Sequence, residues 1–164
     1  MDIDFNPADT FVFTPLDPAS IEAGVCFSAY FDELQTLLEA GFDPEKSVSA
    51  HPEDLTPPNG LLLVARSFGI AMGCGAIKIV RDSSLTYGEI KRMWVAKEAR
   101  GLQVGQRLLT GLEAFARQCG LQTVRLDTHH ALKAARALYE KNGYVEIAPY
   151  NDNPYAQHWY EKSL

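Results

Sequence analysis

Apolar residues recur along the chain in two periods, one typical of helices and one typical of strands. Helical spacing predicts helices at 21–40, 104–119 and 132–141. Alternating or continuous apolar runs predict strands at 11–13, 61–65, 70–80, 86–95, 123–128, 144–147 and 158–162. Ser20 is the predicted N-cap of the first helix, and Gly41 is its predicted C′ residue. The order of these segments predicts a mixed α/β fold, in which an antiparallel meander precedes a strand–helix–strand unit.

Composition fits one globular domain over residues 1–164. Of the 164 residues, 46% are hydrophobic and 22% are charged, close to the globular average. The net charge of −6 argues against a nucleic-acid partner, because such proteins usually carry basic surfaces. No apolar run reaches the roughly 18–20 residues of a membrane span, and the acidic start lacks the pattern of a signal peptide. We therefore expect a cytoplasmic protein with no membrane partner, as a monomer or homodimer.

The cysteines and histidines favour structural roles. Cys26, Cys74 and Cys119 are scattered in apolar surroundings, which predicts buried thiols in a reducing compartment. The four histidines show no spacing typical of metal ligands, so the sequence predicts no metal site. His129 and His130 follow a predicted strand end, where they could line a binding cleft.

Residues 93–106 contain a strand end, a short turn and a glycine-containing helix start. The first turn of a helix presents unpaired N–H groups and the positive end of the helix dipole, so it can bind an anion such as a pyrophosphate. Gly101 and Gly105 allow the backbone to approach without a Cβ, and Arg100 and Arg107 add positive charge. The segment is neither a P-loop nor a dinucleotide fingerprint. On these residues alone, an ordinary strand–loop–helix connection remains the alternative.

Two motifs resemble those of the GNAT acetyltransferase family. Its Arg/Gln-x-x-Gly-x-Gly/Ala signature is matched by Arg100-Gly101-Leu102-Gln103-Val104-Gly105, and the end of its fourth strand by Met93-Trp94-Val95. Its second motif is matched by Leu138-Tyr139-Glu140-Lys141-Asn142-Gly143-Tyr144, and the tail 154–162 resembles a bacterial subset of small members. The sequence departs from the pattern at Gln103, where glycine is commonest. That departure predicts a negative φ at Gln103, or a different contact.

The resemblance implies a twisted, mainly antiparallel sheet of about seven strands flanked by helices. Its fourth and fifth strands splay apart at a bulge near 93–95. It also implies acetyl-CoA as the cosubstrate, with no metal. The pantetheine arm would lie along the fourth strand and the pyrophosphate on the loop and helix start. The residues that the resemblance assigns to the cosubstrate are Met93, Trp94, Val95, Arg100, Gly101, Leu102, Gln103, Val104, Gly105, Gln106 and Lys141.

Acetyl transfer to an amine needs a base for the ammonium proton and an acid for the departing thiolate. The resemblance places Tyr139 at the family's catalytic tyrosine; the alternative is a tyrosine packed on the sheet. Glu89 lies eleven residues before Arg100, the spacing of the general-base glutamate in histone-acetylating members. Its alternatives are an ion pair with Lys91 or Arg92, or an ammonium anchor with water as the base. Strand alternation predicts one face shared by Glu89, Lys91, Met93 and Val95.

The acceptor is the part of the reaction that the sequence defines least. The connection 42–60 carries four prolines and is predicted to be irregular, with one helical turn near 51–55 and a role in covering the acceptor pocket. The acidic balance suits a cationic amine, whereas Arg92 or Arg125 could hold an acceptor carboxylate. We expect a small-molecule amine such as an amino acid, a polyamine or an amine toxin. The alternatives are a protein or peptide N-acetyltransferase and a non-catalytic acyl-CoA-binding sensor.

Overall fold

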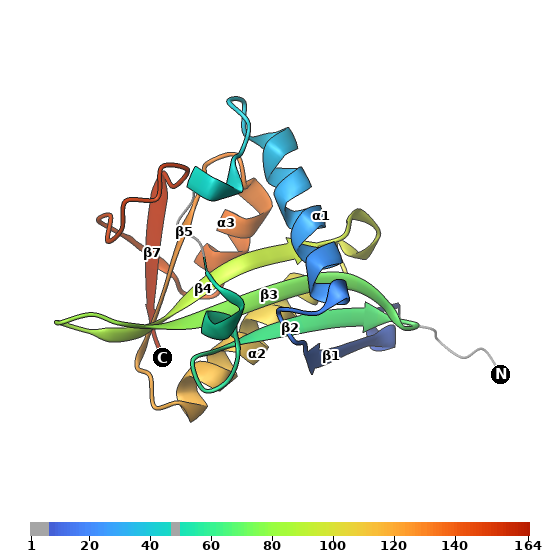
Figure 1. Ribbon diagram of the computed structural model, residues 1–164, viewed down its shortest axis with the longest axis horizontal. Helices are drawn as coiled ribbons and strands as arrows, with labels where there is room; N and C mark the ends of the chain where they lie inside the picture. The colour runs from blue at the N-terminus through green and yellow to red at the C-terminus, as the bar shows by residue number, and fades with distance from the viewer. Residues whose placement is uncertain (1–6, 47–49) are drawn as a thin grey trace.

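The computed structural model describes residues 7–46 and 50–164, and shows a seven-stranded sheet with helices on both faces (Figure 1). The strands are β1 (Phe11–Pro15), β2 (Gly60–Ser67), β3 (Ile70–Arg81), β4 (Thr86–Val95), β5 (Thr123–Thr128), β6 (Val145–Ile147) and β7 (His158–Ser163). The α-helices are α1 (Ile21–Leu37), α2 (Val104–Gln118) and α3 (Lys133–Lys141). The strand order is β1-β2-β3-β4-β5-β7-β6, antiparallel throughout except between β4 and β5. The predicted mixed α/β fold is confirmed.

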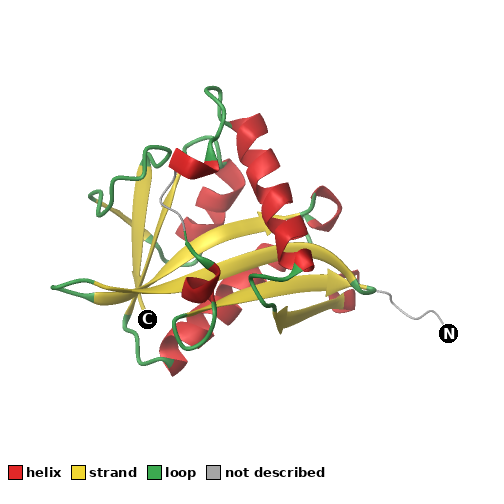
Figure 2. Ribbon diagram, in the orientation of Figure 1, coloured by secondary structure: helices red, strands yellow, loops and turns green. Residues whose placement is uncertain are grey.

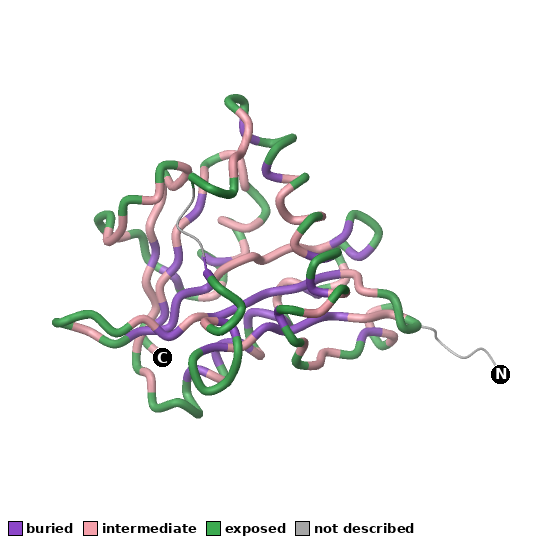
Figure 3. The backbone as a smooth tube through the Cα atoms, in the orientation of Figure 1, coloured by how far each residue is buried: buried purple, intermediate pink, exposed green. Residues whose placement is uncertain are grey.

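Helices cover the two faces of the sheet (Figures 1 and 2). Helix α1 packs on β3 and β4 from one face, and α2 packs on β2, β3 and β4 from the other. The buried side of α2 repeats at helical spacing through Leu108, Leu112 and Ala116, all with no solvent exposure. Helix α3 joins α2 in one apolar cluster, and the residues beneath α1 form a second. The central strands are therefore buried on both faces, as Figure 3 shows.

Helix α1 is shorter than its apolar pattern predicts. Ser20 caps it as predicted, because its side chain accepts a hydrogen bond from Ala23 N–H at 3.1 Å. The helix ends at Leu37, where Leu38 turns to an extended conformation and buries its side chain. Gly41 is therefore not the C′ residue. It closes a later turn, with a φ of 76° and an N–H that bonds to Leu38 O at 2.9 Å.

Strand β4 contains a bulge at Arg92. The register with β3 shifts there, so that Gly75 on β3 faces both Arg92 and Met93. Arg92 takes the left-handed conformation, with a φ of 55°. Gly75 leaves room opposite, since a Cβ at that position would lie 2.4 Å from Met93 Sδ and the methionine side chain would have to move. The bulge predicted near 93–95 is present and begins one residue earlier.

The bulge reverses the faces of the second half of β4. Glu89 and Lys91 share one face, where they form an ion pair. Arg92 also lies on the α1 side, because its guanidinium stacks over phenylalanine rings of α1. Met93 and Val95 instead pack into the apolar cluster on the α2 side. The single face predicted for Glu89, Lys91, Met93 and Val95 is therefore wrong beyond Lys91. Strict alternation assumes regular pairing, and the left-handed residue breaks it.

Strands β4 and β5 run together only briefly. Their parallel register joins Gly88 to Val124 and Glu89 to Arg125. Beyond this point β4 continues to Val95, while β5 stays beside β7 (Figure 1). The edge of β4 from residue 90 onward thus has no ladder partner in β5, and its backbone groups can bond to a ligand. The predicted splay between the fourth and fifth strands is confirmed.

The connection between α1 and β2 contains two short 3₁₀ turns, Pro44–Lys46 and Pro52–Leu55. The second confirms the helical turn predicted near 51–55, and residues 47–49 lie outside the described residues. Hydrogen bonding links the first part of this connection to the far side of the fold, since Asp43 N–H donates to Tyr155 Oη at 2.8 Å.

The sequence predicted the burial of the cysteines only in part. Cys26 and Cys74 are buried as predicted, but Cys119 is exposed because it caps the solvent-facing end of α2, so the prediction of three buried thiols is wrong. Over residues 7–46 and 50–164, no three His, Cys, Asp or Glu side chains gather as metal ligands. No helix in the same ranges is long and apolar enough to cross a membrane.

Candidate active site

A cleft of about 560 Å³ opens where β4 and β5 part. Ten of the eleven residues that the family resemblance assigned to the cosubstrate line it; Leu102 does not, and packs instead against the apolar cluster on the α2 side. Sequence reasoning missed the wall contributed by α1, which includes Tyr30 and Glu33, and the segment 131–135 at the start of α3. The apolar pattern of this segment predicted a helix, and part of that helix faces this cleft.

Helix α2 begins at the cleft without a side-chain cap. Gln103 is its N-cap residue, and the Gln103 side chain makes no capping hydrogen bond. The first helical bond runs from Arg107 N–H to Gln103 O at 3.0 Å, so the N–H groups of Val104, Gly105 and Gln106 have no helical acceptor. Together with the helix dipole, these donors form a site that suits the phosphates of a ligand lying in the cleft.

Two residues of the loop before α2 take the left-handed conformation. Gly101 has a φ of 78°, and Gln103 has a φ of 63°. The negative φ predicted for Gln103 is therefore wrong. The loop keeps the backbone shape that glycine adopts without strain, although a glutamine occupies the position.

We expect Gln103→Gly to stabilise the protein by about 0.5–1 kcal/mol. A side chain in the left-handed region costs roughly 1–2 kcal/mol, and the greater freedom of glycine in the unfolded chain offsets part of the gain. Urea unfolding measures the difference. Gly101→Ala, which introduces the same strain, should lower the free energy of unfolding by about 1 kcal/mol. A loss of stability in Gln103→Gly would show that the glutamine side chain stabilises the loop.

The positive charge around the cleft differs from the sequence-based expectation. Arg100 lines the cleft but donates to Glu33 Oε1 at 2.8 Å. Arg107 does not line it, since its guanidinium lies 4.2 Å from the Phe13 ring centre on the other side of α2. Lys133 and Lys141 of α3 line the cleft instead. The cation expected from Arg107 is therefore supplied from α3.

Gly105 lies where α2 begins, and a Cβ there would meet Leu138 Cδ2 at 3.3 Å and Val95 Cγ2 at 3.7 Å. We expect Gly105→Val to weaken acetyl-CoA binding about tenfold, because the branched side chain would wedge α2 from α3 at the cleft. Titration calorimetry measures the Kd. Gly105→Ala is the control and should change it less than about threefold, since only one tight contact is added. Normal affinity in the valine variant would argue against a role for this helix start in binding.

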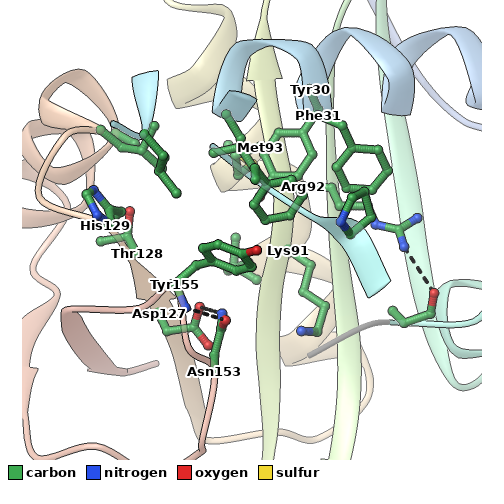
Figure 4. A pocket seen from close by; sticks show the side chains of 18 of the residues that line it. Tyr30, Phe31, Lys91, Arg92, Met93, Asp127, Thr128, His129, Asn153 and Tyr155 are labelled. Carbon is green, nitrogen blue, oxygen red and sulfur yellow. Dashed lines mark hydrogen bonds between the residues drawn. The ribbon is translucent and has the colours of Figure 1, made fainter. Parts of the chain in front are cut away.

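A second, smaller cavity of about 130 Å³ adjoins the cleft (Figure 4). The residues that line both are Tyr30, Leu34, Met93, Leu132, Ala135 and Tyr139. Phe42, Pro44 and Ala50 of the α1–β2 connection form one wall of the smaller cavity, and Tyr155 of the β6–β7 connection forms another. The connection therefore lies beside this cavity, where its predicted covering role would place it.

Tyr139 of α3 lies where the two cavities meet, and it is only 5% exposed. No residue in the described ranges hydrogen bonds to its hydroxyl, and among those residues only Tyr144 Oη is both buried and unpaired. Because the unpaired Tyr139 hydroxyl is not among the fully buried atoms, it keeps contact with the cavities that Tyr139 lines. Burial raises the pKa of the Tyr139 phenol, and Tyr30 and Asp127 raise it further. The phenol is protonated at neutral pH, as an acid catalyst must be.

Glu89 lies near this site without lining either cavity. It is 5% exposed, and both of its oxygens are engaged: Oε1 lies 2.9 Å from Lys91 Nζ, and Oε2 accepts a hydrogen bond from Tyr150 Oη at 2.9 Å. The ion pair with Lys91 was one of the alternatives left open by the sequence. The role of Glu89 as a base stays a prediction.

Asp127 is the carboxylate that lines the smaller cavity, and sequence reasoning missed it. It lies at the end of β5, where Asn151 donates to Oδ2 at 2.7 Å. Asn153 donates to Oδ1 at 2.9 Å (Figure 4). Within the described residues Asp127 has no ion-pair partner. Burial raises the pKa of Asp127, and the charge of Glu89 adds to the increase. Its place at the end of a predicted strand, two residues before His129, was the one available sequence signal.

His129 also lines the smaller cavity, but its tautomer limits what it can do. Its Nδ1 accepts a hydrogen bond from Ala131 N–H at 3.0 Å. Burial lowers the pKa of His129, so the ring is neutral at pH 7 and carries its proton on Nε2. His129 can thus donate a hydrogen bond from Nε2, whereas Asp127 can accept a proton.

Comparisons with known proteins agree with this geometry. A sequence model described as "Acetyltransferase (GNAT) family" matches residues 27–144. An "IAA acetyltransferase" of Azospirillum brasilense is 39% identical over 119 residues, which are 73% of this chain and 76% of that protein. The crystal structure of a proposed acyl-CoA N-acyltransferase of Klebsiella pneumoniae is 34% identical, with a TM-score of 0.72 over 94% of this chain and 97% of that one.

A more distant structure shares the fold and contains the cosubstrate. It is that of a proposed streptothricin acetyltransferase of Bacillus anthracis in complex with acetyl coenzyme A. It is 21% identical, with a TM-score of 0.59 over 71% of this chain and 69% of that one. The family match covers both motifs, the helix start at the cleft and the tyrosine between the cavities. This chain therefore belongs to the GNAT acetyltransferase family.

Proposed function

We propose that this protein transfers the acetyl group of acetyl-CoA to the primary amine of a small molecule. The observation that carries the proposal is the junction of the two cavities at Tyr139, because it brings a cosubstrate cleft and an acceptor pocket to one hydroxyl. The uncapped start of α2 suits a pyrophosphate, and the unpaired edge of β4 suits the amides of pantetheine. The relative crystallised with acetyl coenzyme A supports this choice of cosubstrate. Acetyl-CoA supplies the acetyl group as a thioester.

Asp127 is the proposed base and Tyr139 the proposed acid. Deprotonating an ammonium whose pKa is about 10.4 costs roughly 4–5 kcal/mol at pH 7. Asp127 lines the acceptor pocket, so it can take this proton directly or through one water. The neutral amine then attacks the thioester carbonyl, the C–S bond breaks as Tyr139 donates its phenolic proton to the leaving sulfur, and the second proton lost by the amine restores the phenol. Glu89, the base predicted from sequence spacing, is the second candidate.

The smaller cavity favours a small acceptor over a protein. Its volume is about 130 Å³, and Phe42, Pro44 and Tyr155 are among the residues that line it, so the space suits a small molecule. Asp43 N–H and Tyr155 Oη join the α1–β2 and β6–β7 connections by a hydrogen bond. The carboxylate of Asp127 inside suits the cationic form in which an amine arrives.

The test is thiol release from acetyl-CoA with a panel of amino acids, polyamines, amine antibiotics and peptides. We expect release with at least one small amine at a rate far above that with peptides. Faster release with peptides would point to protein acetylation instead. Tight acetyl-CoA binding without release for any acceptor would favour the non-catalytic sensor. Binding itself is checked by a rise in Tm, because a ligand specific to the native state stabilises it.

A further inference from the structure

Arg92 is a half-buried cation that the acetyl-transfer steps proposed above do not use. Its guanidinium lies beneath α1, 4.3 Å from the centre of the Phe27 ring and 5.7 Å from that of Phe31. One terminal nitrogen donates to Ala50 O at 3.0 Å. The left-handed bulge turns the side chain toward α1, and Arg92 lines the acceptor pocket. A guanidinium carries five N–H donors, so most of the Arg92 donors have no acceptor among the described residues.

Arg92 differs from the other half-buried arginines because no carboxylate in the described residues pairs with it. The paired arginines are Arg66 with Glu22, Arg100 with Glu33, Arg125 with Glu161 and Arg136 with Glu140. Burial lowers the pKa of Arg92, which reflects the cost of holding this charge away from water. Stacking on two rings compensates only part of that cost. Within the described residues no nitrogen of Arg92 is both fully buried and unpaired, so its remaining donors keep some solvent exposure, and Arg92 lines the pocket.

The acceptor pocket therefore has a charge of each sign. Figure 4 shows Arg92 under α1 and Asp127 near the end of β5, on different sides of the cavity. Burial raises the pKa of the Tyr30 phenol, and the charge of Asp127 raises it further while the charge of Arg92 lowers it. Arg125, the other arginine considered from sequence, does not line the pocket. It is held by Glu161 at 2.8 Å and stacks over Tyr87.

We propose that Arg92 binds a carboxylate of the acceptor, so that the substrate is an amine that also carries a carboxylate, such as an amino acid. The inference rests on the proposed function, since it concerns the pocket from which the amine attacks. Asp127 receives the ammonium, and the planar guanidinium of Arg92 receives the carboxylate. A plain amine would leave the Arg92 charge without a partner.

Matched acceptors test this assignment in the wild-type enzyme. Each set contains an amino acid, its carboxamide and the corresponding amine without a carboxylate. One set uses ω-amino acids, which vary the distance between the amine and the carboxylate. Thiol release from acetyl-CoA gives kcat/KM for each. We expect the carboxylate-bearing member to be favoured about 30-fold or more in at least one set. Equal values across every set would overturn the inference and leave the proposed function intact. No release from any member, with acetyl-CoA bound, would overturn both.

Variants identify the residue responsible for the preference. Arg92→Met should reduce the preference to near unity, and Arg92→Lys should retain part of it, because lysine keeps the charge but not the bidentate geometry. Arg125→Met is the matched control and should keep the wild-type preference. The Kd of acetyl-CoA, which reports on the other cavity, shows that each variant is folded. An undiminished preference in Arg92→Met would overturn the assignment; should that variant not fold, an undiminished preference in Arg92→Lys would overturn it instead.

Discussion

Tyr139→Phe is expected to lower kcat about 10²- to 10³-fold, the usual contribution of a positioned acid catalyst. The substitution removes only the hydroxyl, which lies at the junction of the two cavities and makes no hydrogen bond within the described residues. The ring stays, so its edge-on contact with Tyr144 is preserved. The Kd of acetyl-CoA should therefore change little. Steady-state kinetics and calorimetry measure the two quantities separately.

Tyr144→Phe is the matched control for this experiment. Tyr144 belongs to the same motif and lies 5.8 Å from Tyr139 between ring centres, but its hydroxyl is buried and has no hydrogen-bond partner among the described residues. Removing that hydroxyl should leave kcat unchanged and stabilise the protein by about 1 kcal/mol, since an unsatisfied buried group is lost. If Tyr139→Phe kept wild-type turnover, Tyr139 would have no role as the acid. Equal losses in both variants would mean that packing, rather than proton transfer, sets the rate.

The pH profile provides a further check on Tyr139. Burial raises the pKa of its phenol above the ordinary tyrosine value of about 10. An acid must be protonated to act, so activity that depends on Tyr139 is lost only as the pH rises through this raised value. We therefore expect no alkaline decline from Tyr139 below about pH 10.

Patterns within one element predicted the fold well. Strands β4 and β5 have the bounds that their apolar pattern predicts, because strand propensity and flanking turns agree there. Backbone conformations at single residues were harder. Neither arginine nor glutamine favours the left-handed region, so local propensity gives no sign of the bulge at Arg92 or of the conformation of Gln103. Pairing with Gly75 imposes the bulge from another strand.

The candidate site could be predicted only where a contiguous motif forms it. The loop before α2 and Tyr139 lie within such motifs, and both line the cleft. Asp127 does not, because its setting depends on Asn151 and Asn153, which lie 24 and 26 residues further along the chain. The α1 wall of the cleft was missed for a similar reason: an apolar stripe looks the same whether it faces a core or a cavity.

Asp127→Asn is expected to lower kcat about 10²- to 10³-fold, because the amide cannot accept the ammonium proton. The wild-type rate should rise with pH as Asp127 ionises. Since burial and Glu89 raise the pKa of Asp127, this acid limb should lie above the ordinary aspartate range of about 3.9. The limb should disappear in Asp127→Asn. The asparagine can still accept a hydrogen bond from Asn151 or Asn153, so the fold should be retained, as Tm would show.

Glu89→Gln separates the two candidate bases. If Asp127 is the base, Glu89 acts through its charge alone, and removing that charge lowers the pKa of Asp127. The variant should then keep most of its kcat at pH 7 and shift its acid limb to lower pH. The glutamine can still accept the hydrogen bond from Tyr150 Oη, so packing is disturbed little. If Glu89 is the base instead, Glu89→Gln loses turnover while Asp127→Asn keeps it. Comparing Asp127→Asn with Glu89→Gln thus shows which carboxylate accepts the ammonium proton. It is either Asp127, which lines the pocket, or Glu89, which is paired with Lys91.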